Sequence, residues 1–139
     1  MKLYLYYIGK SRDSHANAMA EEYFKRSNRF AKCEMREIHP DRFDLWAKHP
    51  SASKILLDPI GRAYDSAQFT GLVKKNQDQA RDMIFVIGGA DGLSSDWRHR
   101  ADLMMALSPM TMPHELARVV LAEQIYRAFT WLNGHPYPR

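Results

Sequence analysis

Two short runs in the last third of the chain constrain its fold most strongly. In the first run, the strand pattern Met83–Ile87 ends in the glycine turn Gly88-Gly89-Ala90-Asp91-Gly92. In the second, a short apolar strand breaks at Ser108-Pro109, and a long helix begins a few residues later with Pro113 in its first turn. Glycine has no Cβ, so a ligand can approach the backbone of such a turn closely. Because ligands of open α/β sheets bind at loops that follow the strands, the two runs together predict one ligand site.

The rest of the chain alternates between strand patterns and helix patterns. Five strands are predicted, over Lys2–Ile8, Cys33–Ile38, Lys54–Asp58, Met83–Ile87 and Leu103–Leu107. Four helices are predicted, which start at Asp13 or Ser14, Asp65 or Ser66, Ser94 or Ser95, and Pro113, and end near Phe30, Gln79, Asp102 and Leu132. Two segments are expected to be irregular: Asp41–Ser53, a loop or one short helix, and Pro59-Ile60-Gly61, a turn that ends the third strand. This order predicts an α/β fold with a mainly parallel sheet and helices on both faces.

Length, charge and cysteine content limit the class of protein. The 139 residues are predicted to form one domain, and the net charge of +4 favours a polyanionic partner without requiring one. Cys33 is the only cysteine, which rules out an internal disulfide and a cysteine-based metal site, and the histidines lack a metal-ligand spacing. The apolar run Leu3–Ile8 is too short for a signal peptide, and no stretch reaches the length of a membrane span. We therefore expect a cytoplasmic protein with no bound metal and no membrane segment.

The glycine turn does not fit the common nucleotide-binding motifs. A dinucleotide fold places G-x-G-x-x-G after its first strand, whereas Gly9 stands alone after Lys2–Ile8. No G-x-x-x-x-G-K-[ST] phosphate loop occurs either. NAD and ATP are therefore not expected as ligands. Taken alone, Gly88-Gly89 is best explained as a tight turn, and the second run is what favours a ligand site.

The last helix, Pro113–Leu132, is apolar on more than one side. Its apolar residues form an inward stripe and a second set outside that stripe: Ala117, Leu121, Ile125, Ala128, Phe129 and Leu132, and then Leu116, Val119, Val120, Tyr126 and Trp131. A helix of this kind is buried on more than one side, and in a chain this small a second copy can supply the second cover. We therefore expect a homodimer.

Several charged residues have ordinary structural explanations. Arg118 and Arg127 on the last helix are expected to pair with Glu115 or Glu123. His114, at the start of that helix, is expected to cap it rather than to take part in catalysis. Basic residues at the end of the first predicted helix favour a helix C-terminus through the macrodipole, with RNA contact as the alternative: Lys25, Arg26, Arg29 and Lys32.

Three stretches carry a family resemblance: F-V-I-G-G-A-D-G-L-S, L-S-P-M-T-M-P-H-E-L-A-R-V-V-L-A-E-Q-I-Y-R-A-F and the tail N-G-H-P-Y-P-R. They resemble the RlmH family of SPOUT-class methyltransferases. The match is dense from about Lys54 to the C-terminus and includes Met1–Gly9, whereas Pro40–Ser53 matches poorly and is shorter than usual. The resemblance implies methylation of N3 of a pseudouridine in 23S ribosomal RNA, on the ribosome, with S-adenosylmethionine (SAM) as methyl donor. It also implies a homodimer and a C-terminal trefoil knot, a rare exception to ordinary topology, whose loops hold the cofactor.

The resemblance also assigns roles to individual residues. Positions that line the family's cofactor site correspond to Leu57, Gly88, Leu107, Ser108, Pro109, Met110, Thr111 and Met112. The apolar members can wall a slot for adenine, with backbone groups as hydrogen-bond partners. In the tail, His135 can orient the base or accept a proton, Tyr137 can stack on or hydrogen-bond the base, and Arg139 can hold a phosphate. The family usually has a second histidine where this chain has Pro138, and a tail that packs on the partner subunit is the structural alternative.

Two other functions stay open on the sequence alone. One is a SPOUT methyltransferase with another RNA target, because a fold does not determine a substrate. The other is a non-catalytic ribosome- or RNA-binding dimer, which the short middle segment and the missing second histidine keep open. For docking on ribosomal RNA, contributions are expected from five cations: Lys10, Arg12, Lys25, Arg26 and Arg29.

Overall fold

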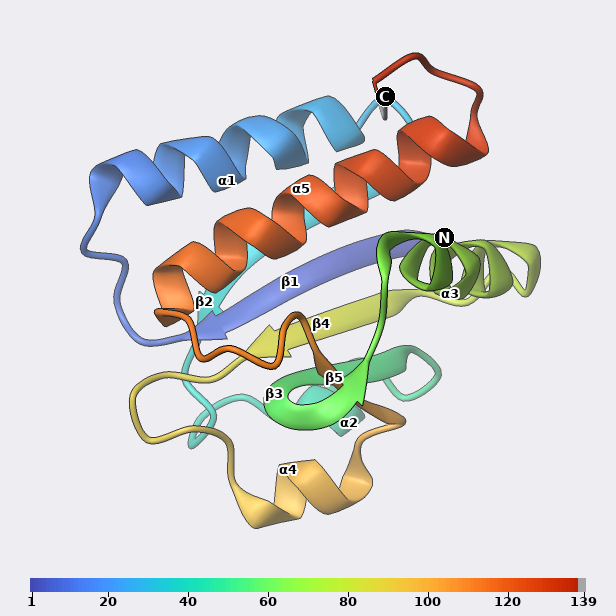
Figure 1. The fold of residues 1–139 in the computed structure, drawn as a ribbon. Helices are drawn as coiled ribbons and strands as arrows, with labels where there is room; N and C mark the ends of the chain where they lie inside the picture. The colour runs from blue at the N-terminus through green and yellow to red at the C-terminus, as the bar shows by residue number, and fades with distance from the viewer. Residues whose placement is uncertain (138–139) are drawn as a thin grey trace.

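The computed structural model describes residues 1–137, in which strands and helices alternate as predicted (Figure 1). The strands are β1 (Lys2–Ile8), β2 (Lys32–Ile38), β3 (Ser53–Ala63), β4 (Met83–Ile87) and β5 (Leu103–Ala106). The helices are α1 (Ser14–Ser27), α2 (Leu45–Lys48), α3 (Ser66–Asp78), α4 (Ser95–Arg100) and α5 (His114–Leu132). Within residues 1–137, no helix has the length and apolar character needed to cross a bilayer.

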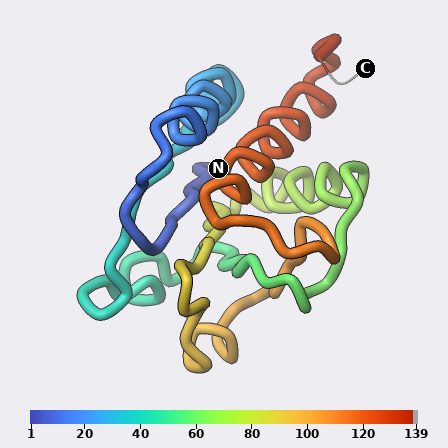
Figure 2. Tube along the Cα trace, turned by 60° about the vertical axis from the view of Figure 1, so that its left-hand side comes forward, coloured from blue at the N-terminus to red at the C-terminus, as the bar shows by residue number. Residues whose placement is uncertain are grey.

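The five strands form one parallel sheet in the order β2-β1-β4-β3-β5. The long helices α1, α3 and α5 cover one face, and the short helices α2 and α4 lie on the other (Figures 1 and 2). The predicted α/β class, with a parallel sheet and helices on both faces, is confirmed. Because β3, β4 and β5 run parallel, the loops that follow β4 and β5 leave the same edge of the sheet, on either side of β3. The trefoil knot stays an inference from the family.

Side chains alternate along the strands, so each face of the sheet has its own apolar cluster. Leu5 belongs to the cluster under α1, α3 and α5, whereas the next residue, Tyr6, belongs to the cluster under α2 and α4. The central strand β4 is buried throughout because helices cover both of its faces. In the thinner layer, Trp46 of α2 packs edge-on against Trp97 of α4, with ring centroids 5.5 Å apart.

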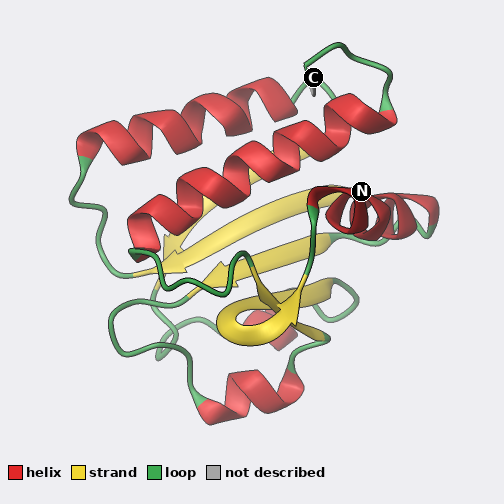
Figure 3. Cartoon of the chain, in the orientation of Figure 1, coloured by secondary structure: helices red, strands yellow, loops and turns green. Residues whose placement is uncertain are grey.

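β3 differs from the prediction, because it does not end at Asp58 but continues to Ala63. Its pairing with β5 is interrupted at residues 58–61 and then resumes, which appears in Figure 3 as a curl in the strand. Gly61 allows this return: a Cβ there would lie 2.7 Å from the carbonyl carbon of Met104. The turn predicted from Pro-Ile-Gly is therefore a bulge inside β3 and not its end.

The segment 41–53 contains the short helix α2, which is one of the two forms predicted for it. Its cap is Asp44, whose side chain accepts a hydrogen bond from the Ala47 amide at 3.0 Å. One smaller difference from the prediction has a local cause. α1 ends at Ser27 and not near Phe30. The Asn28 side chain bonds both the N–H and the C=O of Cys33, each at 3.1 Å, and so turns the chain into β2.

Candidate active site

A cavity of about 400 Å³ lies where the bulge of β3, the β4–α4 loop and the β5–α5 loop meet. Seven of the eight residues that the family resemblance assigns to the cofactor line it: Leu57, Gly88, Leu107, Ser108, Met110, Thr111 and Met112. The eighth, Pro109, does not line it. The tertiary structure thus brings together residues from three separate segments of the chain.

The glycine turn after β4 is compact because it folds back on itself and against β1. The Gly92 amide donates to the Gly89 carbonyl at 3.0 Å, and Gly92 has a φ of +71°. A Cβ on Gly88 would lie 3.0 Å from the backbone of Gly92, and one on Gly89 would lie 3.1 Å from the carbonyl oxygen of Ile8. Side chains at these positions would disturb the turn, and their absence leaves backbone groups open to a ligand.

The opposite wall, the β5–α5 loop, is apolar with a few polar groups. The Ser108 hydroxyl accepts a hydrogen bond from the Met110 amide at 3.0 Å, which shapes the start of the loop. Leu107 and Met112 are half-buried and face the first core cluster as well as the cavity. The loop leads into α5, whose first turn has no side-chain cap. The amides of that turn therefore stay available to an acceptor on a ligand.

His114 and Asp58 also line the cavity, although neither is among the cofactor residues predicted from the sequence. The prediction that His114 caps α5 is wrong, because Pro113 holds the cap position and no side-chain cap bond forms. Asp58, in the β3 bulge, accepts hydrogen bonds from the Ile60 amide at 2.9 Å and from Arg98 of α4. The signal that could have found Asp58 is its place directly after Leu57 and before a turn.

The ionic pairs expected on α5 are confirmed. Arg118 lies 3.1 Å from a carboxylate oxygen of Glu115, and Arg127 lies 2.7 Å from one of Glu123. Among residues 1–137, no three histidine, cysteine or acidic side chains gather as a metal site would require.

The tail lies at the other end of α5 from the cavity. α5 has 19 residues and so spans about 28 Å. Its first residue, His114, lines the cavity, whereas His135 and Tyr137 follow its last turn. Arg139, and Pro138 beside it, lie outside the described residues. Within one chain, the structure therefore does not bring His135 and Tyr137 to the cavity.

In the single chain, the tail folds back on α5. The Tyr137 hydroxyl donates to a Glu123 carboxylate oxygen at 2.7 Å, and its ring packs edge-on against Tyr126 at 4.6 Å. The backbone N–H of His135 donates to the Thr130 carbonyl at 2.9 Å. Burial, followed by hydrogen bonds to Tyr23 and Glu123, raises the pKa of Tyr137 above its ordinary value. The phenol is therefore a hydrogen-bond donor at neutral pH.

Solved structures share this fold. A probable methylase family protein from Haemophilus influenzae Rd KW20 aligns with a TM-score of 0.65 and 9% identity, over 99% of this chain and 70% of that one. A putative RNA methyltransferase from Bacillus anthracis aligns with a TM-score of 0.58 and 13% identity, over 98% and 96% of the two chains. These likenesses place the chain in the fold class of such methylases.

A family model described as "Predicted SPOUT methyltransferase" matches residues 1–138, and the chain belongs to this family. A protein of Solibacter usitatus (strain Ellin6076), named "Ribosomal RNA large subunit methyltransferase H", is 58% identical over the full length of both chains. A protein of the same name from Chromobacterium violaceum is 36% identical over 155 aligned residues, 100% of this chain and 99% of that one. The resemblance seen in the sequence is confirmed. The alignment with the Solibacter protein covers 139 residues, so the short segment near residues 40–53 does not set this chain apart.

Proposed function

We propose that this chain transfers the methyl group of SAM to N3 of a pseudouridine in 23S ribosomal RNA, on the assembled ribosome in the cytoplasm. One observation carries the proposal: in a chain of the SPOUT methyltransferase family, the β3 bulge and the β4–α4 and β5–α5 loops meet around one apolar cavity. The name of the 58% identical relative supports ribosomal RNA as the substrate. The proposal treats residues 1–139 as one catalytic domain.

The cavity suits SAM in size and in chemistry. Its volume falls in the range of small-molecule sites, and leucine and methionine side chains provide an apolar slot for adenine. Gly88 and Gly89 allow the cofactor to approach backbone donors and acceptors of the β4–α4 loop. The uncapped first turn of α5 suits the carboxylate of the methionyl group, because helix N-termini favour anions. We assign the cofactor to these walls, with Pro109 as a structural residue of the β5–α5 loop.

The chemistry asks little of the protein beyond placement. Bound SAM supplies a methyl group that its sulfonium already activates. The protein must hold N3 in line with that methyl, exclude water and receive the N3 proton. We assign Tyr137 to stacking on or hydrogen-bonding the base, and His135 to orienting the base or receiving the N3 proton. Arg139 is assigned to a substrate phosphate.

A homodimer would bring tail and cavity together. Because the described tail residues pack on the second half of α5 and do not line the cavity of their own chain, we propose that the tail of a second copy completes the site. Of the apolar residues outside the α5 stripe, Val119 and Tyr126 are buried within the chain. Others stay exposed along one side of the helix, with Leu116 and Trp131 each 51% exposed and Val120 37% exposed. We propose that this side of α5 docks on a second copy.

Titration with SAM tests the cofactor assignment directly. We expect micromolar binding by calorimetry for the wild type and its loss in Gly88→Trp, which fills the turn. Gly71→Trp is the matched control, because a Cβ at Gly71 in α3 meets no atom within 4 Å. Mass mapping of 23S ribosomal RNA from a deletion strain then tests the position of the methyl group. If the wild type does not bind SAM, with or without ribosomes, the methyltransferase proposal is wrong and an RNA-binding dimer takes its place.

A further inference from the structure

The β1–α1 loop, residues 9–13, runs along the rim of the cavity. It begins beside Gly89 of the cavity wall, where a Cβ would lie 3.1 Å from the carbonyl oxygen of Ile8. It ends against Glu115, the residue after His114 of the opposite wall. Figure 1 shows the loop passing the first turn of α5. The loop is thus joined to two walls of the cavity without lining it.

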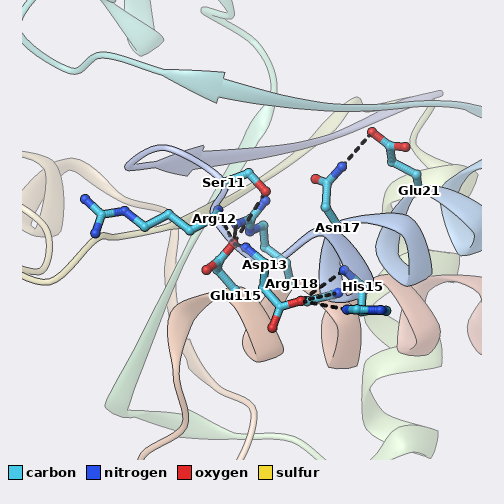
Figure 4. Close-up of polar contacts among 9 residues, drawn as sticks. Ser11, Arg12, Asp13, His15, Asn17, Glu21, Glu115 and Arg118 are labelled. Atoms are coloured by element: carbon cyan, nitrogen blue, oxygen red, sulfur yellow. Dashed lines mark hydrogen bonds and ion pairs between the residues drawn. The ribbon is translucent and has the colours of Figure 1, made fainter.

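One carboxylate oxygen holds the loop in place (Figure 4). Oε1 of Glu115 accepts hydrogen bonds from the amides of Arg12 at 2.8 Å and Asp13 at 3.1 Å, and from the Ser11 hydroxyl at 3.4 Å. The same oxygen accepts a bond from Nη2 of Arg118 at 3.1 Å. These donors fix three consecutive residues of the loop on α5.

The buried Arg118 holds the Glu115 carboxylate from the side of the protein core. It is 2% exposed, and its guanidinium lies 3.9 Å from the centre of the Tyr7 ring. Its Nε and Nη1 have no hydrogen-bond partner within residues 1–137. The guanidinium therefore contacts both the Glu115 carboxylate and the face of the Tyr7 ring, and these contacts help to hold the carboxylate in place.

The carboxylates of Asp13 and Glu115 do not pair with the side-chain charges of Lys10 and Arg12. Glu115 is used by backbone amides and Arg118, and Asp13 caps α1 by accepting from the amides of residues 15 and 16. Lys10 and Arg12 are exposed, and in the described part of the chain neither side chain has a hydrogen bond, an ion pair or a ring contact. The loop, held on α5 at residues 11–13, therefore carries two exposed positive charges that are unpaired in the described part of the chain. Such preorganised cations lose little backbone entropy when they bind an anion.

We propose that residues 9–13 form a phosphate-binding loop for the RNA strand that carries the target nucleotide, with Glu115 and Arg118 as its positioning residues. The inference rests on the proposed function. A base that enters the cavity leaves its flanking phosphates at the rim, where lysine and arginine contacts set the register of the strand. The other cations expected to dock RNA lie near the opposite end of α1, and Arg26 among them is already paired with Glu22 at 3.2 Å. Of the five cations expected to contact RNA, Lys10 and Arg12 therefore lie near the cavity rim, whereas Lys25, Arg26 and Arg29 lie near the other end of α1.

The test replaces both cations, as Lys10→Gln with Arg12→Gln, and measures binding to ribosomes from a strain that lacks the enzyme. The control, Lys2→Gln with Lys75→Gln, removes the same charge at the start of β1 and near the end of α3, at the opposite edge of the sheet. We expect the rim variant to bind ribosomes at least about tenfold more weakly, with unchanged SAM affinity. The slope of log affinity against log salt should fall by about 1.4 to 1.8, the value for two lost phosphate contacts. The control should match the wild type.

The outcomes separate this inference from the proposed function. If wild type binds ribosomes and the rim variant equals the control in affinity and slope, the phosphate-binding loop is refuted. If wild type binds ribosomes but does not methylate them, the proposed function fails while the binding comparison still decides the role of the loop. If wild type does not bind ribosomes, both proposals fail.

A conservative pair of variants tests the positioning role. Glu115→Gln keeps an oxygen acceptor for the loop amides, whereas Glu115→Ala removes it. We expect ribosome affinity to fall at least about tenfold in the alanine variant and to stay within about twofold in the glutamine variant. Equal affinities of the two variants, each shown to be folded by circular dichroism, would remove Glu115 from this role.

Discussion

We expect Gly61→Ala to lower both the stability of the fold and the affinity for SAM. The reason is that Gly61 lies where β3 resumes its pairing with β5 and approaches the backbone of that strand closely. The added Cβ would lie 2.7 Å from the carbonyl carbon and oxygen of Met104 and 2.8 Å from the amide nitrogen of Met105. Ordinary contacts begin near 3.4 Å, so the strands must separate by about 0.7 Å. Backbone atoms on both sides cannot rotate away as a side chain could.

The expected cost follows from that overlap. Forced overpacking costs about 1–3 kcal/mol, and the upper half of this range applies because the contacts are with backbone. In urea denaturation, the midpoint should fall by about 1 M with an unchanged slope. The same shift moves the bulge that contains Asp58 and follows Leu57, both of which line the cavity. A loss of about 1.4 kcal/mol there would weaken SAM binding about tenfold in calorimetry.

Gly71→Ala is the matched control for this change. Gly71 lies in α3, and a Cβ there meets no atom within 4 Å. Alanine in a helix interior is favoured over glycine by about 0.5–1 kcal/mol, so this variant should be more stable and bind SAM normally. If Gly61→Ala keeps both the wild-type midpoint and the wild-type SAM affinity, then the close passage of β3 against β5 does not shape the cavity.

Three further predictions concern a thiol, a carboxylate and the α5 surface. Burial raises the pKa of the Cys33 thiol to about 12. Iodoacetamide at pH 8 should therefore label Cys33 only as fast as the chain unfolds. Rapid labelling of the native protein would contradict the burial of this thiol. Backbone hydrogen bonds from Asp13 and Arg12 lower the pKa of Glu115 from 4.5, so its stabilisation is complete above pH 4.5 and is lost as pH falls through the lower folded value. Wild type should therefore lose more stability than Glu115→Gln between pH 5 and pH 2 in denaturation curves, and parallel curves would count against the bonds. Trp131→Glu should shift the protein towards the monomer in sedimentation equilibrium. The control Met19→Glu, which changes a similarly exposed residue of α1, should leave the dimer intact. A monomeric wild type would refute the dimer.

Local signals predicted most of the elements because they depend on near neighbours in the chain. Asp65 and Gln68 form a reciprocal capping box at the start of α3, four residues that a sequence displays directly. The apolar run of β4 similarly marks a strand covered on both faces. The β3 bulge could not be predicted in this way. Pro-Ile-Gly is a turn signal in either case, and the partner that draws the chain back is Met104, more than forty residues later.

The sequence by itself determined the parallel α/β class, the two loops of the cavity and the residues nominated for SAM, because turn chemistry and family motifs are local patterns. Only the tertiary structure decided which of these residues share one cavity, since the strand order places β3 between β4 and β5. It also kept His135 and Tyr137 away from that cavity, because the tail begins after the far end of α5 and packs on the second half of this helix. The clamp of Glu115 on residues 11–13 likewise depends on packing between α5 and the start of α1, about a hundred residues apart in the chain.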